Sequence, residues 1–195
     1  MRYAERKKKT ESGGNVTGRV GSGNLDYRYP FRGKRCRNGI CKSYVVIASG
    51  DCVYKMDFGK VLEYHIEKKA DITVVCKDMP QGINVERFGT IKMNEECRIE
   101  EFEEKPIVAK SNTISCGIYV IRRRLLIEMI EKCAQEDRYD FVKDVLIRYK
   151  NQKRIFGYKM KEYWKNIASV SDYFDTNMDF LKSEIRDYFF KQYPD

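Results

Sequence analysis

The tripeptide Ser49-Gly50-Asp51 places a carboxylate directly after a buried strand, a position where phosphate chemistry can occur. The run YVVIAS at 44–49 is almost entirely apolar, as expected of a strand covered on both faces. In open α/β sheets, ligands bind beyond the carboxyl ends of the strands. A carboxylate there can hold a magnesium ion that bridges phosphate oxygens. Taken alone, however, the spacing favours an ordinary turn aspartate.

A second charged segment, EEFEEKP, ends in Glu104, Lys105 and Pro106. Lys105 could contact a phosphate as a point charge, and Glu104 could accept hydrogen bonds from sugar hydroxyls. Ser115 opens the following strand, where its hydroxyl could also reach a sugar. A solvated charge run and a plain strand start explain the same residues. These signals are therefore specific only in combination.

The elements that must position these residues alternate between strands and helices. Asp57 and Asp140 are expected to cap two of the helices. The expected strands are 44–49, 71–77, 87–93, 97–105, 114–121 and 154–160; the expected helices are 58–69, 125–134, 140–149 and 171–190, the last with a cap at Ser169 or Ser171. Strands that alternate with helices predict an α/β fold with a largely parallel sheet.

The net charge of +9 is confined to the N-terminal segment. Residues 1–43 hold 12 Lys and Arg against three Asp and Glu, and the remaining 152 residues hold 26 of each sign. The stretch GGNVTGRVGSGN has neither a strand before it nor a helix after it, so residues 1–43 are predicted to be flexible rather than a phosphate-binding loop. The segment is basic enough to contact nucleic acid, but it has no recognisable binding fold, which disfavours this function.

The remaining composition favours a cytoplasmic protein. There is no run of about 18 apolar residues and no apolar stretch after the charged N-terminus, so neither a membrane span nor a secretory signal is expected. The seven cysteines are an odd number without a tight framework, which favours reduced thiols. Zinc at Cys36 and Cys41 is disfavoured because no second ligand pair lies near them. The single histidine, His65, falls in a helical pattern and gives little support to Ser-His or Cys-His catalysis.

Five sequence blocks resemble, in the same order, the ADP-glucose pyrophosphorylase family, the glucose-1-phosphate adenylyltransferases that make the glucosyl donor for bacterial glycogen. The blocks are SGDCVYKMDF at 49–58, RFG at 87–89, FEEKP at 102–106, SCGIYVI at 115–121 and YWKNIAS at 163–169. The match extends from about Tyr44 to Lys182. It is most similar to the D-type, regulatory branch of the family, whose members are found beside a catalytic subunit.

The resemblance implies a role for each matching residue. Asp51 would be a ligand of Mg²⁺, and Asn166 occupies the position where catalytic members place a second metal-binding aspartate. The glucose-1-phosphate pocket would be lined by Gly89, Glu104, Lys105 and Ser115. Because an amide brings no negative charge, Asn166 predicts weaker metal binding and weaker transition-state stabilisation. The chain alone is therefore expected to have low or no activity.

The resemblance also implies what the chain works with. The reaction of the family converts ATP and glucose-1-phosphate to ADP-glucose and pyrophosphate, and the implied partner is a catalytic-type subunit in a hetero-oligomer. Two other functions stay open: an active sugar-phosphate nucleotidyltransferase that tolerates Asn166, and a basic-tailed module that binds a polyanion. Cys52 and Ala168 depart from the family pattern, which often has His and Gly there.

The fold implied by the resemblance is a partial Rossmann-like, GT-A-like nucleotidyltransferase domain. Residues 44–182 are expected to form its sugar-phosphate half, between the basic segment 1–43 and a linker helix and tail at 183–195. Nothing in the sequence matches the Gly-rich nucleotide loop of family members. Their C-terminal β-helix is expected to be absent.

Overall fold

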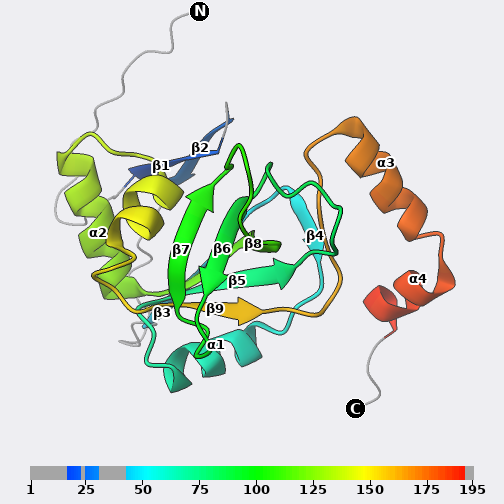
Figure 1. The fold of residues 1–195 in the computed structure, drawn as a ribbon, viewed down its shortest axis with the longest axis horizontal. Helices are drawn as coiled ribbons and strands as arrows, with labels where there is room; N and C mark the ends of the chain where they lie inside the picture. The colour runs from blue at the N-terminus through cyan, green and yellow to red at the C-terminus, as the bar shows by residue number, and fades with distance from the viewer. Residues whose placement is uncertain (1–16, 23–24, 31–42, 192–195) are drawn as a thin grey trace, which may run out of the picture.

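The centre of the molecule is a six-stranded sheet with helices on both faces (Figure 1). The computed structural model describes residues 17–22, 25–30 and 43–191. The strands of the sheet are β3 (Tyr44–Ala48), β5 (Ile72–Asp78), β6 (Gly89–Met93), β7 (Ile99–Glu104), β8 (Thr113–Arg122) and β9 (Ile155–Lys159). Their order is β7-β6-β8-β5-β9, with β3 pairing beside β8. All six strands expected from the sequence are thus present, and the α/β fold class is confirmed.

The prediction of a largely parallel sheet is wrong. Only β5 and β9 pair in parallel; the pairs β3–β8, β5–β8, β6–β7 and β6–β8 are antiparallel. Strands β3, β5 and β9 do run in one direction, as alternation with helices requires. However, β8 returns from the β6–β7 hairpin and lies between β3 and β5 in the opposite direction. Four strands, β3, β5, β6 and β9, run in one direction, and β7 and β8 run in the other, so most neighbouring strands are antiparallel.

Three helices cover the two faces of the sheet: α1 (Phe58–Glu67), α2 (Arg123–Gln135) and the π-helix η1 (Phe141–Ile147). Asp57 caps α1 by accepting a hydrogen bond from the Gly59 N–H at 2.8 Å, and Asp140 caps η1 by accepting one from Lys143. Both caps agree with the sequence prediction. The seven-residue η1 differs from the expected α-helix at 140–149, and π-turns are frequent beside functional sites.

The core forms two clusters, one on each face of the sheet. Ile72 and Val74 of β5 face the cluster beneath α2 and η1, whereas Val75 faces the cluster that contains Val61 of α1. On β8, Tyr119 and Ile121 belong to the first cluster, and the second contains Ile114, Cys116, Ile118 and Val120. Burial on both faces explains why the strand sequences read as continuous apolar runs.

A second, two-stranded sheet lies at the edge of the first and was not predicted. It pairs β4 (Cys52–Tyr54) with β10 (Trp164–Asn166) in antiparallel orientation, so that Asn166 lies opposite Cys52. Each strand has only three residues, which is too short for a periodic sequence signal. This pair joins two of the sequence blocks across more than a hundred residues of chain.

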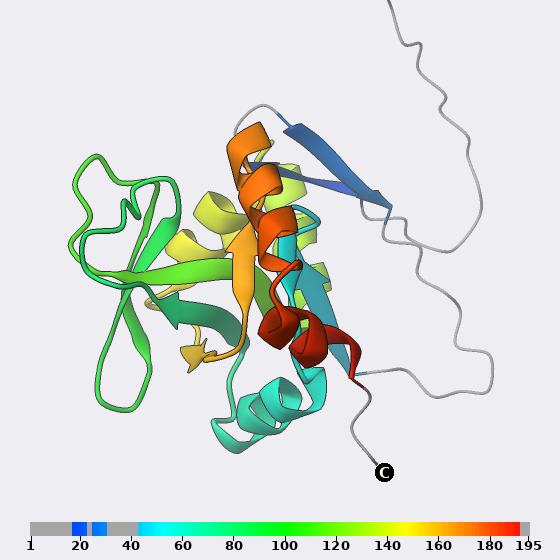
Figure 2. The ribbon, with the colours of Figure 1, turned by 90° about the vertical axis from the view of Figure 1, so that its right-hand side faces the viewer.

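The helix expected at 171–190 is two helices, α3 (Val170–Asp179) and α4 (Ser183–Phe190). Figure 2, viewed from the side on which they lie, shows that they run in different directions. Ser169 caps α3 through its side-chain oxygen, as expected. The reversal between the helices brings Phe180 against Phe189, with ring centroids 4.9 Å apart, and Tyr163 packs on both. Burial of these rings therefore favours the break.

Part of the basic N-terminal segment forms strands, which its composition does not predict. Strands β1 (Thr17–Ser22) and β2 (Leu25–Pro30) form an antiparallel pair. The rest of the segment expected to be flexible lies outside the described residues. Among those that are described, no helix is long and apolar enough to cross a membrane.

Candidate functional site

A cavity of about 370 Å³ opens where the carboxyl end of β3, the β4–β10 pair and the beginning of β6 meet. The end of β7 and the middle of β8 complete its wall. All six residues singled out in the sequence line this cavity: Asp51, Gly89, Glu104, Lys105, Ser115 and Asn166. The structure therefore brings together the residues of five separate sequence blocks, while their individual roles stay predictions.

Asp51 lies at the turn between β3 and β4. The Ser49 hydroxyl donates a hydrogen bond to one oxygen of its carboxylate, Oδ1, and the Cys52 thiol lies 3.6 Å from the same oxygen. Burial raises the pKa of the Cys52 thiol to about 12, so this group stays protonated and can donate at neutral pH. Because both neighbours use Oδ1, the other carboxylate oxygen is available to a ligand in the cavity.

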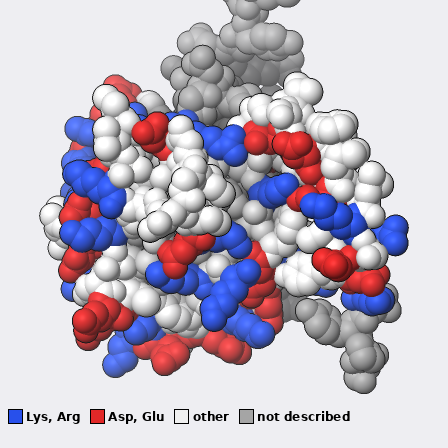
Figure 3. All heavy atoms as spheres, turned by 45° about the vertical axis from the view of Figure 1, so that its right-hand side comes forward, with Lys and Arg blue, Asp and Glu red and all other residues white. Residues whose placement is uncertain are grey.

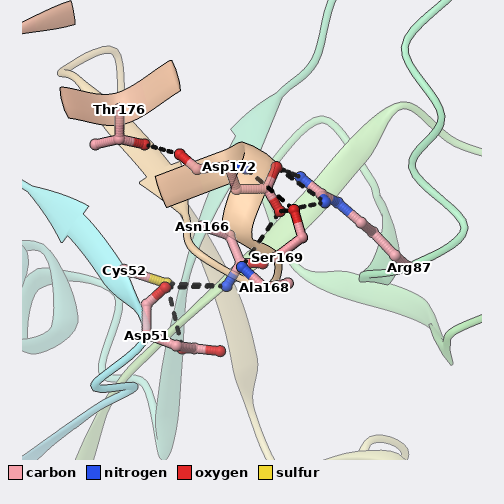
Figure 4. Close-up of polar contacts among 8 residues, drawn as sticks. All are labelled: Asp51, Cys52, Arg87, Asn166, Ala168, Ser169, Asp172 and Thr176. Atoms are coloured by element: carbon pink, nitrogen blue, oxygen red, sulfur yellow. Dashed lines mark hydrogen bonds and ion pairs between the residues drawn. The ribbon is translucent and has the colours of Figure 1, made fainter. Parts of the chain in front are cut away.

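Asn166 is held against the main chain of Asp51 (Figure 4). Its Nδ2 donates to the Asp51 main-chain oxygen at 3.2 Å. The Ile167 N–H donates to the same oxygen at 2.7 Å. Nδ2 also lies 3.7 Å from the Cys52 sulfur. The amide nitrogen is thus directed at the β3–β4 turn. A carboxylate could not make these contacts, because it has no N–H to donate.

Gly89 and Glu104 pair directly across the β6–β7 ladder. A Cβ atom on Gly89 would lie 2.9 Å from Glu104 Oε2 and 2.9 Å from Phe102 Cε1, so only glycine lets the carboxylate lie this close to the strand. Glu104 is half-buried, and its burial raises the pKa of its carboxyl above the ordinary value while Lys105 opposes the shift. The site therefore contains a carboxylate that is partly removed from water.

Lys105 follows β7 with a backbone φ of 47°, in the left-handed region that disfavours residues with a side chain. Its N–H donates to the Phe88 main-chain oxygen at 3.2 Å, which ties the end of β7 to the beginning of β6. This conformation costs about 1 kcal/mol for a residue other than glycine. Backbone strain of this kind is often found at ligand sites.

Ser115 precedes a bulge in β8. Cys76 pairs with Ser115 whereas Val75 pairs with Ile118, so two residues of β8 bulge out of the ladder. One of them is Gly117, with a φ of +70°; it accepts a hydrogen bond from the Ser49 N–H at 2.9 Å. Bulges redirect side chains beside active sites. The Ser115 hydroxyl lies 3.4 Å from the Tyr119 hydroxyl, at the cavity wall.

Among the residues that line the cavity and that sequence reasoning did not single out are Arg87, Tyr119, Phe141 and Trp164. The three aromatic residues read as core residues in the sequence, and each is also largely buried. Arg87 gave no signal of its own, because in the sequence it is a single charged residue at the beginning of the expected strand 87–93. Its partner in the structure is Asp172. The one sequence pattern that indicates a role for Asp172 is Ser169-x-x-Asp172, a capping box at the beginning of α3.

Arg87, which lines the cavity, makes an ion pair with Asp172 (Figure 4). Its Nη1 lies 3.0 Å from Asp172 Oδ2, and Nη1 and Nη2 each lie 3.3 Å from Oδ1. Asp172 also accepts hydrogen bonds from the Ser169 hydroxyl at 2.8 Å and from the Ala168 N–H at 3.3 Å. The guanidinium beside it holds the pKa of the Asp172 carboxyl below its usual value. This pair joins the loop before β6 to α3.

Within the described part of the chain, the donor set around Asp51 does not form a complete metal site on its own. Among residues 43–191 and the two N-terminal strands, no group of three His, Cys, Asp or Glu side chains is arranged to hold a metal. Asp51 offers one carboxylate, and Mg²⁺ in phosphate-handling sites is commonly bound by one or two carboxylates together with substrate phosphates. Asp51 is thus suitable as the protein ligand only where phosphate oxygens supply the others.

Comparison with known proteins identifies the family of the chain. The sequence profile of the nucleotidyl transferase family matches residues 35–183, and the chain belongs to this family. It is similar to the glucose-1-phosphate adenylyltransferases of Bacillus thuringiensis (strain Al Hakam), Bacillus anthracis and Bacillus mycoides (strain KBAB4), with 42% identity over 144 residues in each case. The resemblance to the ADP-glucose pyrophosphorylase family is thereby confirmed. Each alignment covers 72% of this chain and 38% of the relative, so the chain spans little more than a third of the curated relatives it matches.

Proposed function

We propose that the cavity is a binding site for glucose-1-phosphate, as in an enzyme that transfers an adenylyl group to this sugar phosphate. The observation that carries the proposal is the convergence of Asp51, Glu104, Lys105 and Ser115 on one cavity from elements that are far apart in the chain. The similarity to glucose-1-phosphate adenylyltransferases supports this choice of ligand.

The cavity offers a suitable group for each part of the ligand. The Lys105 ammonium binds the phosphate as a point charge, and the Glu104 carboxylate and the Ser115 hydroxyl bind sugar hydroxyls. Because Glu104 is partly removed from water, its hydrogen bonds to a sugar are stronger than they would be at an exposed position. Gly89 keeps the approach to Glu104 open.

Magnesium would be held by Asp51 and would neutralise charge on the phosphates. Asn166 supplies an amide where a second carboxylate would strengthen that site, and its Nδ2 is engaged by the main chain of Asp51. We therefore propose a regulatory-type subunit with low or no activity alone, which works in glycogen synthesis beside a catalytic-type subunit. ATP binding and the transfer step belong to this proposal as well.

A reducing compartment such as the cytoplasm suits this protein. The described residues include five cysteines, all free, of which three are buried. Burial raises the pKa of the Cys76 thiol to about 12, so it stays a thiol at neutral pH. Unpaired cysteines of this kind are typical of cytoplasmic proteins.

The experiment that tests the proposal is a calorimetric titration with glucose-1-phosphate, with and without magnesium, of the wild-type chain and of Lys105→Ala. We expect saturable binding that the substitution weakens at least about tenfold. Lys92→Ala is the matched control, because Lys92 is an exposed lysine paired with Glu101 on the same hairpin, outside the cavity. Equal binding by wild type and Lys105→Ala would refute the proposed phosphate contact, and no binding by the wild type would refute the site.

A further inference from the structure

The contribution of the Arg87–Asp172 ion pair to the stability of the fold does not explain why Arg87 lies at this place. The Arg87 side chain is 49% exposed and that of Asp172 is 21% exposed, and ion pairs between such groups contribute little to folding. Asp172 already has a role without it, because its carboxylate and the Ser169 hydroxyl cap α3. Arg87 nevertheless lines the cavity, together with Lys105.

The guanidinium of Arg87 is fixed on two sides. Asp172 binds Nη1 and Nη2 on one side. On the other side the guanidinium lies over the Phe88 ring, with 4.8 Å between Arg87 Cζ and the ring centroid. Phe88 in turn packs against Trp164, with ring centroids 5.7 Å apart. A guanidinium has five N–H donors, so donors remain for a second anion after Asp172 is bound. Because Arg87 is already ordered, it loses little conformational entropy when it binds a ligand.

The charges in the cavity show why a second cation is needed. A phosphate monoester carries nearly two negative charges at neutral pH, and the same cavity contains the carboxylates of Asp51 and Glu104. Lys105 alone cannot balance this charge. We propose that Arg87 is a second phosphate-binding residue, which binds the phosphate group of the sugar phosphate together with Lys105. In naming a sugar phosphate as the ligand, this inference rests on the proposed function.

Trp164 provides a direct readout of the site. It is the only tryptophan in the protein, it is 7% exposed, and it lines the cavity beside Phe88. Its fluorescence therefore reports on this cavity alone. The full chain is titrated separately with inorganic phosphate and with glucose-1-phosphate, in wild type, Arg87→Gln, Arg87→Lys and Arg154→Gln. Arg154 is the matched control, because it is ion-paired with Asp71 at the opposite end of β5, outside the cavity.

We expect Arg87→Gln to raise the Kd of both ligands at least about tenfold, since it removes a charge-assisted hydrogen bond to phosphate. Arg87→Lys should give a smaller loss, because lysine keeps the charge and loses the planar donor pair. Arg154→Gln should bind like the wild type. Thermal unfolding of each variant checks that the fold is retained, and Arg87→Lys serves in place of Arg87→Gln if that variant does not fold.

The outcomes separate this inference from the proposed function. Wild-type affinities in Arg87→Gln, or a fluorescence response of the wild type to neither ligand, would overturn the role of Arg87. Arg87-dependent binding of inorganic phosphate without any preference for glucose-1-phosphate would support Arg87 as an anion-binding residue. That same result would refute the sugar-phosphate function.

Discussion

The side-chain amide of Asn166 donates to the main-chain oxygen of Asp51 at 3.2 Å, across the short β4–β10 pair. The two positions that would hold a metal in a two-carboxylate site are therefore joined here by a neutral hydrogen bond. Asn166 therefore has a structural role of its own, independent of metal binding.

Asn166→Asp should lower the stability of the metal-free protein and raise its affinity for magnesium. The new carboxylate would face the Asp51 main-chain oxygen with no hydrogen to donate, so the metal-free variant should be destabilised by about 1–2 kcal/mol. Millimolar magnesium should then raise its Tm more than it raises the Tm of the wild type, because two carboxylates now hold the ion. Thermal unfolding with and without magnesium measures both effects.

Asn166→Ala is the control for that substitution, since it removes the donor without adding a charge. It should be destabilised and should show no enhanced response to magnesium. If Asn166→Asp responds to magnesium no more than Asn166→Ala does, then position 166 does not contribute to a metal site in this chain.

Gly89→Ala should destabilise the β6–β7 hairpin and disturb the cavity together. The added Cβ would lie 2.9 Å from both Glu104 Oε2 and Phe102 Cε1, and such overpacking typically costs about 1–3 kcal/mol. Urea unfolding measures the loss. In Gly50→Ala the Cβ would meet no atom within 4 Å, so this control should change the free energy of unfolding by less than about 0.5 kcal/mol. Equal effects of the two substitutions would contradict the close packing at Gly89.

Glu104→Gln should stabilise the fold while it weakens ligand binding. Burial raises the pKa of Glu104 in the folded state, so the unfolded chain loses this proton first as the pH rises. Its contribution to stability is present below the ordinary Glu pKa and is lost as the pH rises through the folded pKa. Relative to wild type, the variant should therefore be more stable at pH 7, and the gain should be smaller at pH 4.5.

Urea midpoints of both proteins at the two pH values measure this difference. A gain of the same size at pH 4.5 and pH 7 would mean that burial does not perturb the Glu104 carboxyl. The titration with glucose-1-phosphate then shows whether the stabilised variant has lost affinity, as a ligand-binding carboxylate requires.

His65 should titrate far below neutral pH. It is fully buried, its Nδ1 lies 2.8 Å from the Thr73 hydroxyl oxygen, and burial, with Arg122 nearby, lowers its pKa to about 4. In the unfolded chain it takes up a proton near pH 6.5, so stability should fall as the pH drops from 6.5 to 4. After allowance for screening, the loss is about 2 kcal/mol.

Proton NMR gives an unambiguous test, because the protein has a single histidine. The imidazole resonances should move only near pH 4, and His65→Gln should show a flatter dependence of stability on pH. A midpoint near 6.5 would show instead that the ring reaches water in the folded state.

Local chemistry was sufficient to predict much of the fold. Asp57, Asp140 and Ser169 cap helices as expected, because capping depends on one side chain and the next turn. The direction of β8 was not predictable in the same way. An apolar strand reads alike in either direction, and only the returning β6–β7 hairpin makes β8 run opposite to β5.

The site was predictable to the extent that its residues belong to ordered sequence blocks. Asp51 and Glu104 were found because each ends a recognisable strand, and the resemblance added Gly89. Arg87 was not found, because its significance depends on Asp172, which is 85 residues away in the chain. Contacts of that range have no local signal, and only the folded structure contains them.

The β4–β10 pair also bears on the stage of folding at which the candidate site forms. Asp51 and Asn166 are 115 residues apart, and closing a loop of that length costs about 4 kcal/mol of chain entropy. Two strands of three residues cannot offset this alone, so we expect the β5–β8 ladder to form first and bring the ends together. We therefore expect the candidate site to assemble late in folding and to be among the first regions that open when the native protein fluctuates.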